Sequence, residues 1–197
     1  MIILVIGGSA SGKSEYAESR MMEWDKRVYF ATMLPYGRES ERTILRHQLL
    51  RKGKGFQTIE CGAGFTKIEI DPEQAILLED LPNLVANELY AKENGLTDDW
   101  ADDLDNPDLW IDDSVLEMQT VELAEEVPPE ERIQQDLEHI MKAKHLVIVT
   151  GDVFADGIDY DPETEKYRML LGRTNQWIAR YADEVIEVIH GIPVRRK

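Results

Sequence analysis

Short apolar runs alternate along the chain with segments in which apolar residues recur every three or four positions. The runs are four or five residues long, which is typical of strands buried on both faces of a parallel sheet. They predict strands at Ile2–Ile6, Val28–Ala31, Ala75–Leu78, Leu146–Thr150 and Val185–Ile189. The intervening pattern predicts helices at Lys13–Trp24, Glu39–Arg51, Leu84–Glu93, Arg132–Lys142 and Tyr167–Tyr181. This alternation favours a single layered α/β domain over all 197 residues.

The segment from Gly95 to Pro129 interrupts the alternation and carries most of the charge. The formal net charge is −17. The stretch Glu93–Glu131 holds 15 acidic residues and no Lys, Arg or His, which leaves 22 basic against 24 acidic residues elsewhere, a net of −2. We interpret residues 93–131 as an acidic insertion on the one domain, with a solvated surface favoured over an acidic functional site. The charge disfavours nucleic acid as a partner.

Composition also bears on the compartment. A single cysteine, Cys61, excludes an internal disulfide framework and suits a reducing cytosol. The opening residues, MIILVIGG, are too short and lack the basic start of a signal peptide, and no run reaches the roughly 20 apolar residues that a membrane span needs. We therefore expect a soluble, cytoplasmic protein without a membrane partner.

A glycine-rich motif follows the first predicted strand and opens the first predicted helix. Its sequence, GGSASGKS, has the spacing of a phosphate-binding loop. Backbone N–H groups of such a loop turn inward around an anion, and the helix adds its positive N-terminal end. We expect the lysine to reach the β and γ phosphates and the final serine hydroxyl to bind Mg²⁺. The nucleotide-binding residues are then Gly7, Gly8, Ser9, Ala10, Ser11, Gly12, Lys13 and Ser14.

The sequence AILLED, residues 75–80, supplies the usual companion of such a loop. It is a buried strand that ends in carboxylates, so Glu79 or Asp80 is a candidate for holding Mg²⁺ directly or through water. The Asn-Lys-x-Asp signature that reads guanine in signalling GTPases is missing, which disfavours a switch protein.

One histidine lies between arginines in the predicted helix 39–51. His47 is off the apolar stripe marked by Ile44 and Leu45, and Arg46 and Arg51 flank it. Nearby positive charge keeps an imidazole neutral and nucleophilic, and the same arginines suit a triphosphate. A single helical histidine is nevertheless more often a surface residue, so the pattern alone leaves the role of His47 open.

Several of these motifs together resemble one family, the bifunctional adenosylcobinamide kinase/adenosylcobinamide-phosphate guanylyltransferases of cobalamin biosynthesis. The matching segments are GGSASGKS, YFAT at residues 29–32, the helix with Glu39, Ile44, Arg46 and His47, FQTIE at residues 56–60, AILLED, and the C-terminal GRTNQWIARYADEVIEVIHGIP. They cover about residues 1–92 and 132–197 in the family's order, so the acidic insertion falls outside the resemblance.

The resemblance implies a three-layer α/β fold of the P-loop NTPase (RecA-like) class with a mostly parallel sheet. It implies that GTP and ATP are substrates with Mg²⁺, that adenosylcobinamide is the acceptor, and that the chain forms a homotrimer. It implies that Lys13 acts in catalysis and that His47 attacks the α-phosphate of GTP. It adds to the nucleotide site Ala31, Thr32, Met33, Gln48, Leu49, Leu50, Arg51, Glu60 and Glu79, with Ser14 and Glu79 toward the metal.

The chain departs from the family pattern at four positions. Gly151 and Asp152 replace an Asn-Glu pair, Met169 stands where an aspartate is expected, and Thr43 replaces an arginine. These departures keep two alternatives open: another P-loop small-molecule kinase, or a nucleotide-binding protein without turnover. Retention of Lys13, Ser14, Glu79 and His47 together argues against the second, since binding alone would not require a nucleophile.

Overall fold

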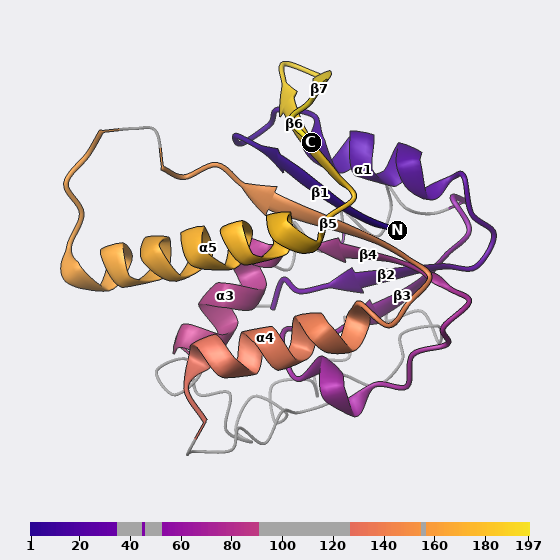
Figure 1. Cartoon of the computed structure of the whole chain (residues 1–197), viewed down its shortest axis with the longest axis horizontal. Helices are drawn as coiled ribbons and strands as arrows, with labels where there is room; N and C mark the ends of the chain where they lie inside the picture. Colours follow the sequence, from indigo (N-terminus) through magenta and orange to yellow (C-terminus); the bar gives the residue numbers. More distant parts are fainter. Residues whose placement is uncertain (35–44, 46–52, 91–126, 155–156) are drawn as a thin grey trace.

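The computed structural model describes residues 1–34, 45, 53–90, 127–154 and 157–197, and these contain one seven-stranded sheet (Figure 1). The strand order is β3-β2-β4-β5-β1-β6-β7. The strands are β1 (Ile2–Gly7), β2 (Arg27–Ala31), β3 (Phe56–Glu60), β4 (Ala75–Glu79), β5 (His145–Gly151), β6 (Glu184–Ile189) and β7 (Ile192–Arg195). All neighbouring pairs are parallel except β6 and β7, which form an antiparallel hairpin at one end of the sheet.

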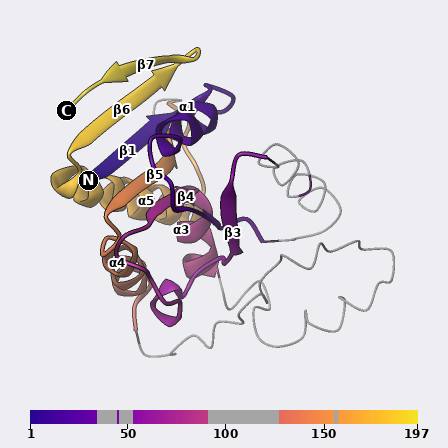
Figure 2. The ribbon, with the colours of Figure 1, turned by 90° about the vertical axis from the view of Figure 1, so that its right-hand side faces the viewer.

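Helices cover both faces of the sheet, which makes three layers (Figure 2). Helix α1 (Lys13–Met21) lies on one face, and α3 (Leu81–Tyr90), α4 (Pro129–Ile140) and α5 (Pro162–Tyr181) lie on the other, with a short 3-10 turn, η1 (Phe65–Lys67), beside α4. Side chains alternate between the layers along each strand. Thus Ile3 and Val5 of β1 pack with Ala17 of α1, whereas Leu4 packs with Leu171 of α5.

Local chemistry sets the helix starts. The Asp161 carboxylate accepts hydrogen bonds from the backbone N–H groups of Glu163 and Thr164, and Pro162 occupies the first turn of α5, where a missing N–H costs nothing. Helix α4 likewise begins with a proline, Pro129. Both helices therefore begin three to five residues before the predicted starts, because the apolar periodicity does not reveal a first turn that begins with proline.

The predicted fold class is confirmed: this is a three-layer α/β structure of the P-loop NTPase type with a mostly parallel sheet. The five predicted strands are present with boundaries shifted by at most one residue. Two strands were not predicted. β3 is only half-buried, and β7 is an edge strand that contains Pro193, so neither shows a continuous buried run.

The remaining helix predictions have mixed outcomes. Helix α1 ends at Met21 rather than Trp24, and α3 begins at Leu81 rather than Leu84. The predicted helix 39–51 lies outside the described residues except for Leu45, which is helical and 48% exposed, so that residue does not mark an inward face. Most of the predicted acidic insertion also lies outside them. Among the helices of the described ranges, none has the length and hydropathy to cross a membrane.

Candidate functional site

The candidate site residues gather at the edge of the sheet where the parallel strands end. Gly7 at the end of β1 pairs with Gly151 at the end of β5. Ala31 at the end of β2 pairs with Glu60 on one side and with Glu79 on the other. Ligands of open α/β sheets bind outside the carboxyl ends of the strands. Register therefore brings together residues that are far apart in sequence.

The glycine-rich loop has the backbone conformation that its sequence predicts. Gly12 has a φ of 89°, a left-handed conformation that favours glycine. A Cβ atom on Gly7 would lie 2.5 Å from Ser11 Oγ and 2.7 Å from the Val188 carbonyl oxygen, so only glycine fits there. The N–H of Gly191 donates a 2.7 Å hydrogen bond to the Ser11 carbonyl, which fixes the loop against the β6–β7 turn.

The start of α1 leaves donors for an anion. The helix begins at Lys13, directly after Gly12, and no side chain caps it. The first N–H groups of an uncapped helix have no intrahelical acceptor, and they combine with the helix dipole to favour phosphate. Lys13 folds back over the loop, where its Nζ donates to the Gly8 carbonyl at 3.3 Å. The lysine ammonium is thereby held at the mouth of the loop.

Ser14 and Glu79 join the loop to the end of β4. The Ser14 hydroxyl donates a 2.6 Å hydrogen bond to Glu79 Oε1. The other carboxylate oxygen, Glu79 Oε2, is buried and has no hydrogen-bond partner among the described residues. Burial, reinforced by the neighbouring Asp80 carboxylate, raises the pKa of Glu79 to about 8. A buried carboxylate oxygen without a hydrogen-bond partner is costly, and a cation beside it would stabilise the ionised form.

The donor set at this point fits Mg²⁺. A serine hydroxyl and a carboxylate are hard oxygen ligands, and Mg²⁺ commonly takes one or two protein oxygens plus substrate phosphates and water. No group of three or more His, Cys, Asp or Glu residues that could hold a metal ion occurs in the described ranges. With one hydroxyl and one carboxylate, the Ser14–Glu79 pair is suited to a metal ion that also binds nucleotide phosphates and water.

A buried polar network holds the ends of β2 and β4 together. The Thr32 hydroxyl accepts a 2.7 Å hydrogen bond from the Asp80 N–H and lies 2.8 Å from the Asp80 carbonyl. The Asn87 amide of α3 donates to the carbonyl oxygens of Thr32 at 2.8 Å and Gly62 at 3.0 Å. Thr32 is fully buried and its side chain holds this edge together, while its part in nucleotide binding stays a prediction.

The other predicted residues differ in where they lie. Ala31, Met33 and Glu60 lie at the same strand edge, with Ala31 buried and the other two half-buried. His47, Gln48, Leu49, Leu50 and Arg51 lie outside the described residues. Both flanks of that segment are described. On one flank, Leu34 packs against Gly62: a Cβ atom added to Gly62 would lie 2.8 Å from Leu34 Cδ2. On the other flank, Lys54 forms an ion pair with Glu18 of α1.

Asp80 lies at this edge too, although the family resemblance implies Glu79 as the residue toward the metal. Its Oδ1 accepts a 3.0 Å hydrogen bond from the Asn83 N–H at the start of α3, and burial raises its pKa. The sequence signal was present, because Asp80 ends the same acidic strand. Of the positions that depart from the family pattern, Thr43 lies outside the described residues. Gly151 ends β5, the Asp152 N–H donates to the Gly7 carbonyl at 3.2 Å, and Met169 is exposed on α5.

Fold and loop together define a P-loop nucleotide-binding protein: a parallel sheet, a glycine loop that opens a helix, and a carboxylate held against the loop's serine. Comparison with known proteins narrows the class. The profile of the cobinamide kinase / cobinamide phosphate guanyltransferase family matches residues 3–196. The chain belongs to this family, and the prediction that it is a transferase enzyme is confirmed.

Two curated relatives match over their full length. One, from Salmonella typhimurium (strain LT2), is 30% identical over 205 aligned residues that cover 100% of both chains, and is named bifunctional adenosylcobalamin biosynthesis protein CobU. The other, from Escherichia coli (strain K12), carries the same name and is 29% identical over 208 aligned residues, again with 100% of both chains covered. The aligned spans include the acidic segment, whose predicted status as an insertion stays a prediction.

Proposed function

We propose that this protein phosphorylates the aminopropanol hydroxyl of adenosylcobinamide and then transfers GMP from GTP to the new phosphate, giving adenosylcobinamide-GDP. The observation that carries the proposal is the Ser14–Glu79 contact beside Lys13, in a chain whose family is named for both transfers. GTP and ATP serve as the donors. The homotrimer that the resemblance implies remains a prediction.

The first reaction uses the phosphate loop. Backbone N–H groups of residues 8–14 surround the β and γ phosphates, and Lys13 stabilises the charge that builds on the transferred group. Mg²⁺ carried by the nucleotide would supply further charge neutralisation at Ser14 and Glu79. Displacing the Lys13 ammonium from the Gly8 carbonyl costs little, because phosphate oxygens replace that acceptor. Positioning and electrostatics therefore account for this step without a covalent intermediate.

The second reaction divides one displacement into two. A nitrogen of the His47 imidazole attacks the α-phosphorus of GTP, a P–N bond forms, and pyrophosphate leaves with the electron pair of the broken P–O bond. A phosphate oxygen of adenosylcobinamide phosphate then attacks the same phosphorus and releases the imidazole. This division means that two highly charged anions never have to react directly. The proposal rests on the helix motif with Arg46 and Arg51, and on flanks of that segment that adjoin the site edge at Leu34 and α1 at Lys54.

The covalent step has a direct test. The protein is incubated with Mg²⁺ and GTP labelled at the α-phosphate, then separated by denaturing electrophoresis. We expect covalent label that mild acid releases as GMP and that base leaves largely in place, as for a phosphoramidate. His47→Ala and His47→Asn should both remove it while phosphorylation of adenosylcobinamide persists.

Three outcomes separate the alternatives. Undiminished label in both variants moves the nucleophile to another residue. No label on the wild-type protein, with phosphorylation intact, supports a P-loop kinase without the second activity. If the wild-type protein shows neither covalent label nor phosphorylation of adenosylcobinamide, the result supports a nucleotide-binding protein without turnover.

A further inference from the structure

Two large apolar side chains are exposed where the chain leaves β5 and on α5. Phe154 follows β5 and is 37% exposed, and Met169 on α5 is 55% exposed. The loop that begins at Gly151 leaves the same strand edge as the glycine-rich loop and turns back into α5 (Figure 1). Large exposed apolar side chains that lie together at a strand edge mark binding surfaces more often than isolated ones do.

The Phe154 ring lies on α5. A Cβ atom on Gly172 would meet ring atoms of Phe154 at 3.3 and 3.6 Å, so the absence of a side chain at that position allows the ring to lie against the helix. Met169 is three residues before Gly172, which puts both on one face of α5. Phe154 and Met169 therefore form one surface, which we call the apolar platform.

The platform is held in place by polar contacts. Arg168 donates to the Val153 carbonyl at 3.1 Å, reaches the Phe154 carbonyl at 3.5 Å, and its guanidinium lies 4.7 Å from the centre of the Tyr160 ring. The Phe154 N–H donates to Asp152 Oδ1 at 3.3 Å. One side chain from α5 thus fixes the backbone that carries the aromatic ring.

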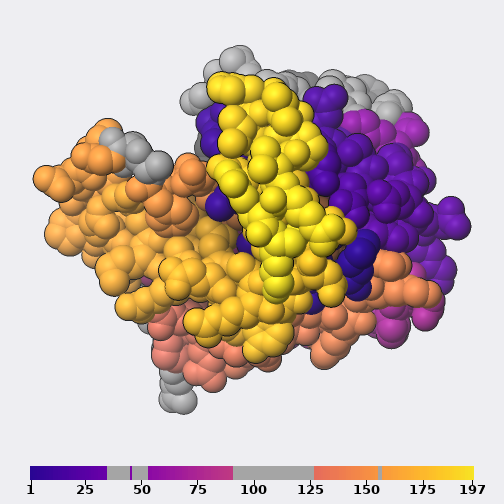
Figure 3. Space-filling model, turned by 45° about the horizontal axis from the view of Figure 1, so that its top comes forward, coloured from indigo at the N-terminus to yellow at the C-terminus, as the bar shows by residue number. Residues whose placement is uncertain are grey.

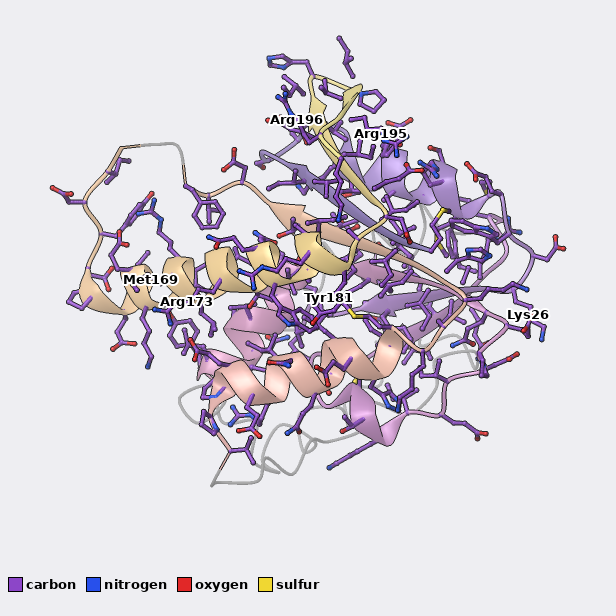
Figure 4. All side chains as sticks on the ribbon, viewed as in Figure 1. Lys26, Met169, Arg173, Tyr181, Arg195 and Arg196 are labelled. Carbon is purple, nitrogen blue, oxygen red and sulfur yellow. The ribbon has the colours of Figure 1, made fainter. Side chains whose placement is uncertain are left out.

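The same contacts lead directly to the phosphate loop. The Asp152 N–H donates to the Gly7 carbonyl at 3.2 Å, and Phe154 lies two positions further along the chain. Figure 3 shows the surface hollowed between the yellow β6–β7 hairpin and the orange segment after β5, with indigo N-terminal atoms visible there. Figure 4 labels Met169 near the first turns of α5, on the side to which β5 points, and Tyr181 at the far end of the helix.

We propose that Phe154 and Met169 form the surface that receives an apolar part of the acceptor's macrocycle and so orients its hydroxyl toward the phosphate loop. The inference rests on the proposed function and adds residues that bind the acceptor to it. The acceptor is far larger than the phosphate site, and its macrocycle must lie against a neighbouring wall while the hydroxyl meets the γ-phosphate. An aromatic ring offers a large apolar contact area, and a thioether adapts to irregular apolar shapes, so the pair suits such a part of the acceptor.

The test measures steady-state phosphorylation of adenosylcobinamide by the full chain. Phe154→Ala should raise KM for adenosylcobinamide about tenfold, the loss expected for one aromatic contact, and should leave kcat and KM for ATP within about twofold. Phe154→Tyr keeps the ring and should behave as wild type. Met169→Gln keeps the length of an exposed side chain but adds polarity, and should raise the same KM several-fold without risk to folding.

The matched control is Tyr181→Ala, because Tyr181 is also an apolar exposed side chain of α5, 57% exposed, but lies at the other end of the helix. It should leave KM for adenosylcobinamide unchanged. The platform alone would be overturned by an unchanged KM in both Phe154→Ala and Met169→Gln, or by an equal rise in KM in Tyr181→Ala. It would also be overturned by a changed sedimentation coefficient without a changed KM, which would assign the surface to a second copy of the chain. A wild-type protein that fails to phosphorylate adenosylcobinamide would overturn the proposed function instead.

Discussion

The hydroxyl of Ser14 donates a 2.6 Å hydrogen bond to Glu79 and so joins two segments that are 65 residues apart. Ser14 lies in the first turn of α1, and Glu79 is the last residue of β4. Their contact brings the phosphate loop and the acidic strand end into one site. It also leaves the second oxygen of Glu79 buried without a partner among the described residues, where a cation would bind.

Loss of the Lys13 charge should stop turnover and spare the fold. Lys13→Ala removes the ammonium that faces the β and γ phosphates, while its hydrogen bond to Gly8 is exposed and contributes little to stability. We expect kcat/KM for phosphorylation to fall at least about a hundredfold, as when one transition-state donor is lost. Thermal unfolding and phosphorylation kinetics check both statements.

Lys26→Ala is the matched control, since Lys26 forms an exposed ion pair with Asp71 away from the loop (Figure 4). It should keep wild-type kinetics. Near-normal phosphorylation by Lys13→Ala would contradict the assignment of the loop.

Glu79 should make stability depend on pH. Because its pKa is about 8 in the folded protein and 4.5 for the ordinary carboxyl, its favourable contribution is present below pH 4.5 and is lost as pH rises through about 8. Without metal or nucleotide, Glu79→Gln should therefore raise the free energy of unfolding at pH 9 by about 1–3 kcal/mol relative to wild type, and the difference should shrink toward pH 5. Urea unfolding of both proteins at the two pH values measures this.

The Glu79 carboxylate should also make Mg²⁺-dependent nucleotide affinity depend on pH, and this affinity should rise with pH whereas the stability contribution falls. A proton and a cation compete for Glu79, so Mg²⁺-dependent nucleotide affinity should rise between pH 6 and pH 9 in the wild-type protein. Calorimetric titration of the Glu79→Gln variant should show no such rise. A wild-type affinity that is independent of pH would remove Glu79 from the metal site.

Arg132 should be essential for stability rather than for chemistry. Its guanidinium pairs with Glu88, whose side chain is only 1% exposed, and donates to the carbonyl oxygens of Glu88 and Val127. Arg132→Ala leaves a buried carboxylate unpaired and should cost about 3–5 kcal/mol in unfolding free energy. Joint replacement of both residues by leucine should cost less than Arg132→Ala. Equal costs in urea unfolding would mean that the ion pair is not what matters there.

The acidic insertion should be dispensable for GMP transfer. Arg132 ties Val127, near the C-terminal end of the insertion, to Glu88 near the end of α3, so a short linker can join the two helices. Val127 accepts a hydrogen bond from Arg132, Pro128 precedes α4 and Pro129 begins it, so a replacement should stop at Glu126. A Gly/Ser linker in place of residues 95–126 should keep labelling by α-labelled GTP within a few-fold. A folded variant without labelling would show that the segment builds or gates the site.

Some residues of this site could be predicted from sequence patterns, and others could not. The loop and Glu79 could be predicted because spacing and strand ends follow local rules, and register then brings them together. The roles of Thr32 and Asn87 could not, since their hydrogen bonds join β2, β4 and α3 across 48 to 55 residues of chain. The Phe154 surface was missed because it depends on Gly172, 18 positions later, lying under the ring.

The proposed function is tested most directly by identifying the products of one reaction. The wild-type protein is incubated with adenosylcobinamide, Mg²⁺, γ-labelled ATP and unlabelled GTP. The products are then separated and identified by mass spectrometry. The account predicts labelled adenosylcobinamide phosphate first and labelled adenosylcobinamide-GDP afterwards, with pyrophosphate released in equal amount to the second product. Without GTP, ATP can still serve as the phosphoryl donor, so the reaction should stop at labelled adenosylcobinamide phosphate. Absence of both labelled products from folded, nucleotide-binding protein would contradict the account.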